Sequence, residues 1–310
     1  MPLGPILAQI LWTGFANSSY YVLFTIAFAL VLKVAQLWNF AQAGAMGVAF
    51  YTMFLALNWL DWPPWAAVAL GLATTIAVAL LFESYGLRIL RKRRSSNLMF
   101  FIFTLLFSEF VAYVLMFLFG TEPQTLYPSI LSPVRIVGDI AVSNWDLTAV
   151  SVTAVTVLVL WTFLRFHREG QFMLAVADNG RLAELYGISA QRAYIVSMTI
   201  AAVVGTEGMY LFGTRAGVIP NTPTDLMLFA VIGTLLGGMG RVFAAAFAAV
   251  ILALIQSFSV LIIASKWQGL VLYGFLFVVI VLFPRGFRLP DLSAWRPRPA
   301  RPRIIRDGEV

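Results

Sequence analysis

The chain has 310 residues, of which 61% are hydrophobic and only 11% charged, and its mean hydropathy is +0.88. Soluble domains carry roughly 25% charged residues, so a chain this apolar is expected to have lipid as its solvent. It has no cysteine and one histidine, His167, which excludes disulfides, thiol catalysis and a multi-histidine metal site. The net charge of +7 favours orientation in a membrane over nucleic-acid binding.

Apolar segments long enough for membrane helices recur along the chain. A spanning helix needs about 20 mostly apolar residues, because a rise of about 1.5 Å per residue must cover about 30 Å of hydrocarbon. No Lys or Arg precedes Lys33, so we expect the first segment to be retained rather than cleaved as a signal peptide. The fold prediction is an all-α polytopic bundle of about nine spans, near residues 15–36, 41–60, 65–82, 99–119, 146–166, 193–213, 226–240, 242–264 and 267–284. The seventh segment is short and reads as a half-span or a re-entrant segment, and a count of eight spans is the alternative.

Basic residues gather on alternate connections between these segments. With nine alternating spans, 18 of the 21 Lys and Arg fall on one side, and only Arg135, Arg215 and Lys266 fall on the other. Cytoplasmic loops are enriched in Lys and Arg, so we expect the N-terminus outside and the C-terminus in the cytoplasm. This topology predicts a multi-pass protein of the inner (plasma) membrane.

Two connections are longer than a simple turn. Residues 120–145 are expected outside, whereas residues 167–192 are expected inside and have the apolar periodicity of an amphipathic helix. After a transmembrane permease domain over 1–288, the Pro/Arg-rich residues 289–310 predict a disordered basic cytoplasmic tail.

Two glycine-containing stretches are candidates for the translocation path. Transporters use close helix contacts and broken helices that expose backbone groups to a solute. The first stretch has polar residues followed by small ones, and the second has three glycines within four positions, which favours a helix break. Ordinary tight packing is the alternative for both. The candidates are Asn39, Gln42, Gly44, Gly47, Gly237, Gly238 and Gly240.

Two carboxyl groups lie within apolar segments, at Glu109 and Glu207. An ionisable group in a membrane span is costly and usually faces the interior of the bundle. Each is a candidate for a substrate-amine contact, a gate or a proton site. A protonated or partnered carboxyl buried between helices is the alternative.

The sequence has no phosphate-binding GxxxxGK[ST] loop and no catalytic constellation at useful spacing. We therefore do not expect an enzyme. The remaining classes are a channel, an ion-coupled carrier, and a permease that is driven by another subunit.

Several motifs, in order, resemble the LivH-type permeases of bacterial branched-chain amino acid ABC importers. They span roughly residues 15–288 and comprise Asn39-Phe40-Ala41, Thr104 through Gly120 with the following Thr121-Glu122-Pro123, Ala177-Asp178-Asn179 with Ala183 through Ile188, Gly233 through Gly240, and Pro284-Arg285-Gly286. The resemblance implies a permease subunit that forms the path by alternating access. Its implied partners are two ATP-binding-cassette ATPases, a second related permease or a second copy, and an external substrate-binding protein. Cofactors are then absent from this chain, and ATP binds the partner ATPases.

The resemblance also implies a role for the 167–192 connection as the helix that couples to the ATPase, with the residues Asp178, Asn179, Arg181, Glu184, Gly187 and Ile188. An interfacial helix lying on lipid is the alternative for this segment. The chain departs from the family pattern at Ala112-Tyr113, at Glu207 and after Gly240. These departures fall in spans where substrate contact is expected, so they do not favour a branched-chain amino acid alone. Since relatives also carry small polar solutes, the resemblance implies branched-chain or related amino acids, or small polar solutes such as urea and amides.

Two other functions stay open at this point. The first is an ion-coupled carrier or channel that works without an ATPase and uses Glu109 or Glu207 as its proton or cation site. The second is a structural membrane anchor for a complex.

Overall fold

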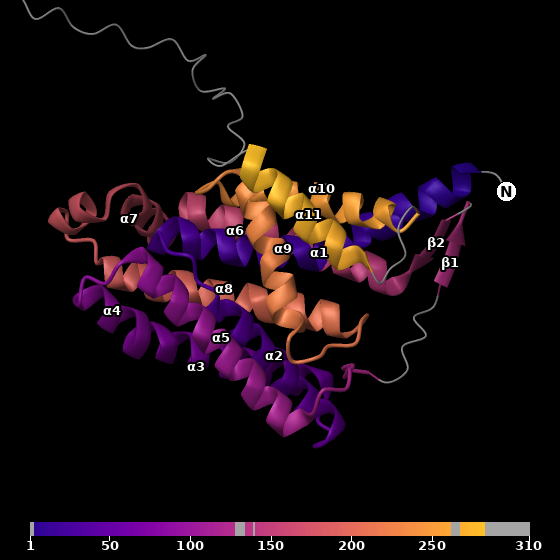
Figure 1. Ribbon diagram of the computed structural model, residues 1–310, viewed down its shortest axis with the longest axis horizontal. Helices are drawn as coiled ribbons and strands as arrows, with labels where there is room; N and C mark the ends of the chain where they lie inside the picture. Colours follow the sequence, from indigo (N-terminus) through magenta and orange to yellow (C-terminus); the bar gives the residue numbers. More distant parts are fainter. Residues whose placement is uncertain (1–2, 128–133, 139, 262–266, 283–310) are drawn as a thin grey trace, which may run out of the picture.

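The computed structural model describes residues 3–127, 134–138, 140–261 and 267–282 (Figure 1). The predicted tail over 289–310, its boundary at 288 and the motif Pro284-Arg285-Gly286 lie outside these described residues. The elements in chain order are α1 (Leu3–Ala35), α2 (Ala41–Asn58), α3 (Pro64–Leu81), the π-helix η1 (Phe82–Leu87), α4 (Arg88–Lys92), α5 (Asn97–Phe119), β1 (Val134–Val137), β2 (Ile140–Ser143), α6 (Asn144–Phe166), α7 (Arg168–Leu185), α8 (Ala190–Gly213), α9 (Thr222–Gly237), α10 (Val242–Ser259) and α11 (Gln268–Leu282).

The apolar segments of the sequence all form helices, which confirms a polytopic helix bundle. Six helices within the described part of the chain are long and apolar enough to cross a membrane: α1, α3 with its extension to Lys92, α5, α6, α8 and α10. The other three apolar segments form α2, α9 and α11, which are shorter or less apolar. α1 begins twelve residues earlier than the predicted segment at 15–36, because Leu3 to Gly14 continue the helical run.

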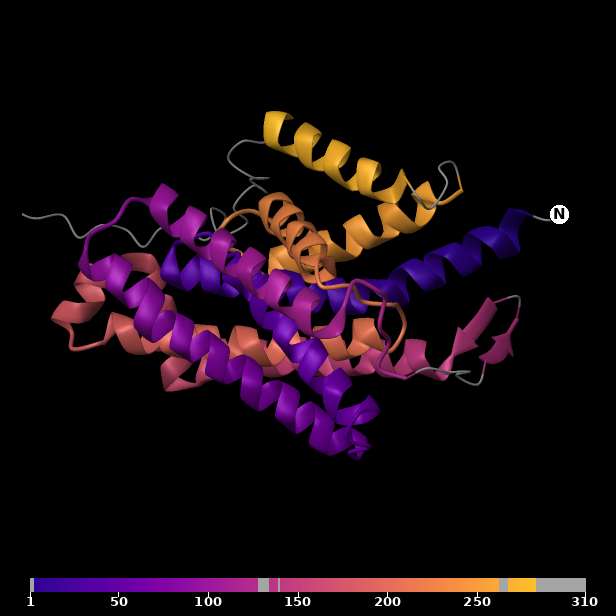
Figure 2. The same ribbon diagram turned by 60° about the horizontal axis from the view of Figure 1, so that its bottom comes forward.

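α1 is the central element of the bundle. It packs against α6, α7, α8, α9 and α10, and Figure 2 shows α10 and α11 on one side of it and α2 and α3 on the other. In its most apolar 18-residue stretch 83% of the residues are buried, compared with 22% in α6. α6 therefore presents most of its apolar surface to the surroundings, as expected for a membrane helix at the outer edge of a bundle.

The bundle has two distinct ends, which Figure 1 shows at opposite sides of its long axis. α7 and α4 lie at one end, which we call the α7 end. The N-terminus and the two strands lie at the other, which we call the hairpin end.

The connection over 120–145 contains an antiparallel β-hairpin that the all-α prediction did not include. β1 and β2 pair from Val134 with Ser143 to Val137 with Ile140. Gly138 adopts φ +65°, a left-handed conformation that favours glycine and that two-residue hairpin turns use. The Gln9 side chain of α1 holds the hairpin, because its Oε1 accepts from the Ala141 amide at 2.8 Å and its Nε2 donates to the Ala141 carbonyl at 3.2 Å.

A buried carboxylate joins three elements at the hairpin end. Asp146 forms a capping box with Ser143 at the start of α6. Its Oδ1 accepts from Arg215 Nη1 at 2.8 Å, and its Oδ2 accepts from Trp12 Nε1 at 3.2 Å and from the Ser143 amide at 2.9 Å. The Arg215 guanidinium lies over the Trp145 ring at 4.5 Å. This network ties α1, α6 and the end of α8 together.

Candidate functional site

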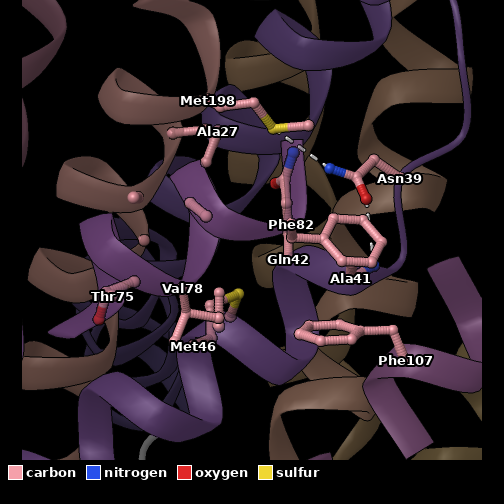
Figure 3. A pocket seen from close by; sticks show the side chains of 15 residues that line it. Ala27, Asn39, Ala41, Gln42, Met46, Thr75, Val78, Phe82, Phe107 and Met198 are labelled. Carbon is pink, nitrogen blue, oxygen red and sulfur yellow. Dashed lines mark hydrogen bonds between the residues drawn. The ribbon is translucent and has the colours of Figure 1, made fainter. Parts of the chain in front are cut away.

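A small pocket lies in the middle of the bundle, between α2, α3 and α8 (Figure 3). Its cavity volume is about 20 Å³, which is room for about one water molecule. Most of its wall is apolar, with Met46 and Val78 among the side chains that point into it in Figure 3. Ala27, Ala41, Ala45, Ala79, Phe82, Phe107, Met198, Ala201, Ala202 and Gly205 complete the apolar wall, and Asn39, Gln42 and Thr75 supply the polar side chains.

The polar side chains of the pocket are incompletely paired. Asn39 Nδ2 donates to the sulfur of Met198 at 3.3 Å, which is a weak acceptor, and Asn39 Oδ1 accepts from the Ala41 amide at 3.2 Å. Gln42 Nε2 is buried and has no hydrogen-bond partner among the described residues. A buried donor without a partner costs about 1–3 kcal/mol, so the two carboxamides are suited to bind a polar solute.

The connection between α1 and α2 carries Asn39 into the pocket. Thr104 of α5 fixes this connection, because its hydroxyl accepts from the Phe40 amide and donates to the Trp38 carbonyl, each at 3.2 Å. Gln36 adopts φ +53°, a left-handed conformation that is strained for a residue with a side chain. Its Nε2 donates to the Ala177 carbonyl of α7 at 2.9 Å. This bond connects α7 directly to the chain segment that holds Asn39.

Four of the predicted path glycines lie at close helix contacts or breaks outside the pocket. A Cβ on Gly44 would lie 3.2 Å from the Ser108 Cα of α5, and one on Gly47 would lie 3.0 Å from the Leu115 side chain. Gly237 packs against the backbone of Ala245, where a Cβ would lie at 2.3 Å. α9 ends at Gly237, so the predicted helix break occurs there, and Gly238 takes φ +90°.

Gly240, the last glycine of that stretch, has φ +86° and lies at the α7 end, outside the central pocket. The structure therefore brings only Asn39 and Gln42 of the predicted path residues together in one pocket. The glycines bring the surrounding helices close together.

The two membrane carboxyl groups lie away from this pocket and from each other. Glu109 is half-buried on α5. Glu207 is half-buried on α8 and faces α6, where the Thr156 hydroxyl lies 2.7 and 2.9 Å from its two oxygens. Of the alternatives drawn from the sequence, the Thr156 contact favours a partnered carboxyl for Glu207.

A buried ion pair that the sequence analysis did not predict lies in the π-helix η1, which directly continues α3. Glu83 is fully buried, and its Oε1 accepts from Arg91 of α4 and, at 3.0 Å, from Gln191 Nε2 of α8. The Arg91 guanidinium also lies 4.3 Å from the centre of the Tyr194 ring. The network links η1, α4 and α8 close to the start of α8, which follows α7 in the chain.

The third predicted apolar segment ends at residue 82, so Glu83 falls in the connection that follows it. Glu83 lies eight residues before Arg91 in a stretch with no proline. A continuous α-helix over this stretch would place the two residues on one face but about 12 Å apart along the axis, so the spacing alone does not predict their contact.

α7 is a surface helix that is joined to the rest of the bundle by a few defined contacts. It is kinked at Asn179, whose backbone is non-helical and whose Oδ1 accepts from the Leu182 amide at 3.0 Å. Glu169 forms an ion pair with Arg192 of α8 at 2.5 Å. Of the predicted coupling residues, Asp178, Asn179, Arg181 and Glu184 are exposed, Gly187 ends the segment at φ +79°, and Ile188 is half-buried.

The second half of α7 exposes large apolar side chains. Leu185 is 83% exposed and Tyr186 is 79% exposed, and Leu182 is also exposed. These side chains are available for contact with either a partner subunit or the lipid surface, which are the two alternatives drawn from the sequence for this segment.

The chain matches the model of a protein family described as branched-chain amino acid transport system / permease component, over residues 10–281. The chain belongs to this family. The curated relatives include the high-affinity branched-chain amino acid transport system permease protein LivH of Escherichia coli (strain K12) and of Salmonella typhimurium. Each is 25% identical over 293 residues, which cover 90% of this chain and 94% of the relative. BraD of Pseudomonas aeruginosa, with the same described role, is 22% identical over 290 residues and covers the same shares.

No solved structure matches the chain. The comparisons confirm the predicted resemblance to LivH-type permeases and the predicted place in the inner membrane. The chain is a membrane transport permease, and the pocket of Asn39 and Gln42 is the candidate solute site of this permease.

Proposed function

We propose that this permease is the membrane subunit of an ATP-binding-cassette importer. Its solutes are branched-chain or related amino acids, or small polar solutes such as urea and short amides. The printed role of the relatives supports the amino acid class, and a pocket with an apolar wall and two carboxamides supports a small solute with both apolar and polar parts. The proposed partners are two ATPase subunits that bind ATP, a second permease subunit or a second copy of this chain, and an external binding protein.

The single observation that carries this proposal is the connection between the exposed surface of α7 and the pocket. Leu185 and Tyr186 offer the apolar surface on which an ATPase would bind. The bond from Gln36 to the Ala177 carbonyl leads from α7 to Asn39, and the ion pair of Glu169 with Arg192 leads into α8, whose Met198 lines the pocket. A rigid movement of α7 would therefore reach both walls of the pocket.

The size of the pocket supports alternating access. Sites for small molecules usually have about 300–1,000 Å³, far more than the 20 Å³ present between α2, α3 and α8. The helices must separate before a solute enters. In the proposed path Asn39 and Gln42 contact the solute, and Gly44, Gly47, Gly237, Gly238 and Gly240 permit the helices to approach and part. Glu109 and Glu207 lie outside the closed pocket, and their proposed place on the path belongs to the open state.

The proposed topology has nine spans, with α7 and the C-terminus in the cytoplasm. The distribution of charge supports it, because the described basic residues at the α7 end far outnumber Arg135 and Arg215 at the hairpin end. Labelling of residues 88–94 and 181–192 from the external medium would overturn this orientation.

The test of the proposal is uptake into proteoliposomes that contain the permease with its co-purified subunits. We expect uptake to require ATP and to stop when the ATPase is removed. Leu185→Glu is expected to abolish ATPase co-purification and uptake. Ile136→Glu is the matched control, because Ile136 is 80% exposed but lies at the hairpin end.

A second variant tests the pocket itself. Gln42→Leu removes the unpaired amide and is expected to lower the affinity for solute while the ATPase still co-purifies. Uptake that persists without ATP, or flux through liposomes that contain this chain alone, would overturn the proposal in favour of an ion-coupled carrier or a channel.

A further inference from the structure

A second cavity lies at the α7 end, where the end of α1, the end of α6 and the start of α10 meet. It has a volume of about 470 Å³, compared with about 20 Å³ for the central pocket. Lys33 of α1, Arg165 of α6 and Arg241 before α10 line it, and no acidic side chain does. Within the described residues none of these three cations forms an ion pair. A cavity with three positive charges attracts an anion.

Helix electrostatics single out Arg241 among the three. Lys33 and Arg165 lie in the last turns of α1 and α6, where a positive charge is favourable because the carbonyl end of a helix is negative. Arg241 is the N-cap of the 18-residue helix α10, where a positive charge is unfavourable. Its guanidinium has no hydrogen-bond acceptor, so it cannot cap the amides of the first turn. An anion in the cavity would offset Arg241 and also face the free amides of Val242 and its neighbours.

The remaining walls of the cavity are those of a lipid site. Trp161 lies one turn before Arg165, and the guanidinium of Arg165 is 5.2 Å from the centre of its ring. Tryptophan is typical of the level of lipid headgroups. α6 also exposes large apolar side chains along its length, among them Leu158 and Val159, each 61% exposed, and an exposed apolar helix surface suits contact with acyl chains.

We propose that Lys33, Arg165 and Arg241 bind the headgroup phosphate of an anionic phospholipid, with its acyl chains along α6. Basic cavities between membrane helices at the cytoplasmic surface bind such headgroups. The site is separate from the central pocket and from the exposed apolar surface of α7. The proposed topology places it in the inner leaflet, but binding itself does not depend on the transport activity.

The test is lipid binding by the full-length chain, purified with its accompanying subunits and titrated with phosphatidylglycerol or phosphatidylcholine in native mass spectrometry. We expect a clear preference for phosphatidylglycerol. The triple variant Lys33→Gln, Arg165→Gln, Arg241→Gln is expected to bind phosphatidylglycerol at least about tenfold more weakly. The control variant Arg88→Gln, Lys92→Gln, Arg93→Gln removes the same charge from exposed residues at the same end and is expected to change binding less than about twofold.

The single variant Arg241→Gln keeps the proposal testable if the triple variant does not fold. In phosphatidylcholine we expect it to raise the melting temperature, because a positive charge leaves the start of α10. In phosphatidylglycerol we expect it to lower the melting temperature, because a headgroup contact is lost. A shift in the same direction in both lipids would overturn the proposal.

Other outcomes would identify a different ligand or none. Equal binding of the two lipids, or equal weakening in the control variant, would show only diffuse attraction. Displacement of the lipid by millimolar inorganic phosphate would identify a site for a free anion. Binding by the isolated chain but not by the assembled complex would show that a partner subunit fills the cavity. Each of these results would overturn the lipid assignment.

Discussion

Among the described residues two carboxylates are buried, Asp146 at the hairpin end and Glu83 at the α7 end, and they differ in how completely their oxygens are hydrogen-bonded. Both oxygens of Asp146 are occupied, by Arg215 on one side and by Trp12 and the Ser143 amide on the other. The network at this end has no unpaired side-chain atom among those that the structure describes as buried.

Glu83 is only partly satisfied. Its Oε1 accepts from both Arg91 and Gln191, whereas its Oε2 and Arg91 Nη1 are buried without partners in the described part of the chain. A buried polar network with free positions is costly, but it can exchange partners without losing all of its bonds. From this comparison we expect the hairpin end to stay fixed and the α7 end to be the one that switches between two arrangements.

The largest expected effect comes from Arg91→Ala, which leaves Glu83 as a buried charge without its cation. We expect the free energy of unfolding to fall by about 3–5 kcal/mol, because an unpaired buried charge is strongly unfavourable. Thermal unfolding in detergent measures it. Arg88→Ala changes an exposed arginine one turn away and should shift stability by less than about 0.5 kcal/mol. Equal losses of unfolding free energy in the two variants would show that the ion pair of Glu83 with Arg91 does not stabilise the fold.

Asp146→Ala should be the next largest change, because three donors lose their acceptor at once. We expect a loss of about 2–4 kcal/mol of stability, and a smaller loss for Asp146→Asn, which keeps one acceptor oxygen. Uptake per folded molecule should stay near the wild-type value. A variant that remains stable but no longer transports would contradict a purely fixed role for this end.

Replacing both residues of each ion pair, Glu83 with Arg91 or Asp146 with Arg215, gives the clearest difference in stability between the two ends. The double variant Glu83→Leu, Arg91→Leu should keep stability within about 1 kcal/mol, since apolar substitutes can replace a buried ion pair, and should lose ATP-driven uptake. The double variant Asp146→Leu, Arg215→Leu should lose more stability, because the Trp12 and Ser143 donors remain unpaired. Stability measured beside uptake tests both expectations, and the reverse order would contradict the comparison.

The smallest effect is expected at Gln36, which links the α7 end to the pocket. Gln36→Gly removes the bond to the Ala177 carbonyl, worth about 1 kcal/mol, and relieves the left-handed backbone by about 0.5–1 kcal/mol. Stability should therefore hardly change, whereas solute transported per ATP should fall. Gln36→Ala, which keeps the strain, is the control and should be the less stable of the two. An unchanged transport ratio in both would exclude this link.

Much of the fold follows from patterns that one segment carries by itself. The nine apolar segments and the amphipathic α7 are visible because hydropathy and a period of 3.6 are local properties. The hairpin was missed because its strands are four residues long, within a connection rich in proline. The π-helix was missed because a helix was expected to end at Phe82, where Glu83 interrupts the apolar run.

The site divides in the same way. Asn39 and Gln42 could be found because they are polar residues at the start of an apolar segment. Phe82, Phe107 and Met198 could not be found, because these apolar side chains come from three different elements. Nothing in the sequence indicates that they line the same pocket. The roles of the glycines as close contacts likewise depend on which helix lies opposite, which only the packing decides.

The length of α1 has a consequence for the bilayer itself. Its 33 residues measure about 50 Å, whereas the hydrocarbon layer is about 30 Å thick. The excess must be met by tilting or by protrusion, and its first turns are held rigidly by Gln9 and Trp12. Hydrophobic mismatch therefore acts on the central helix of the bundle. Turnover should then depend on acyl-chain length, even when lipid charge is held constant.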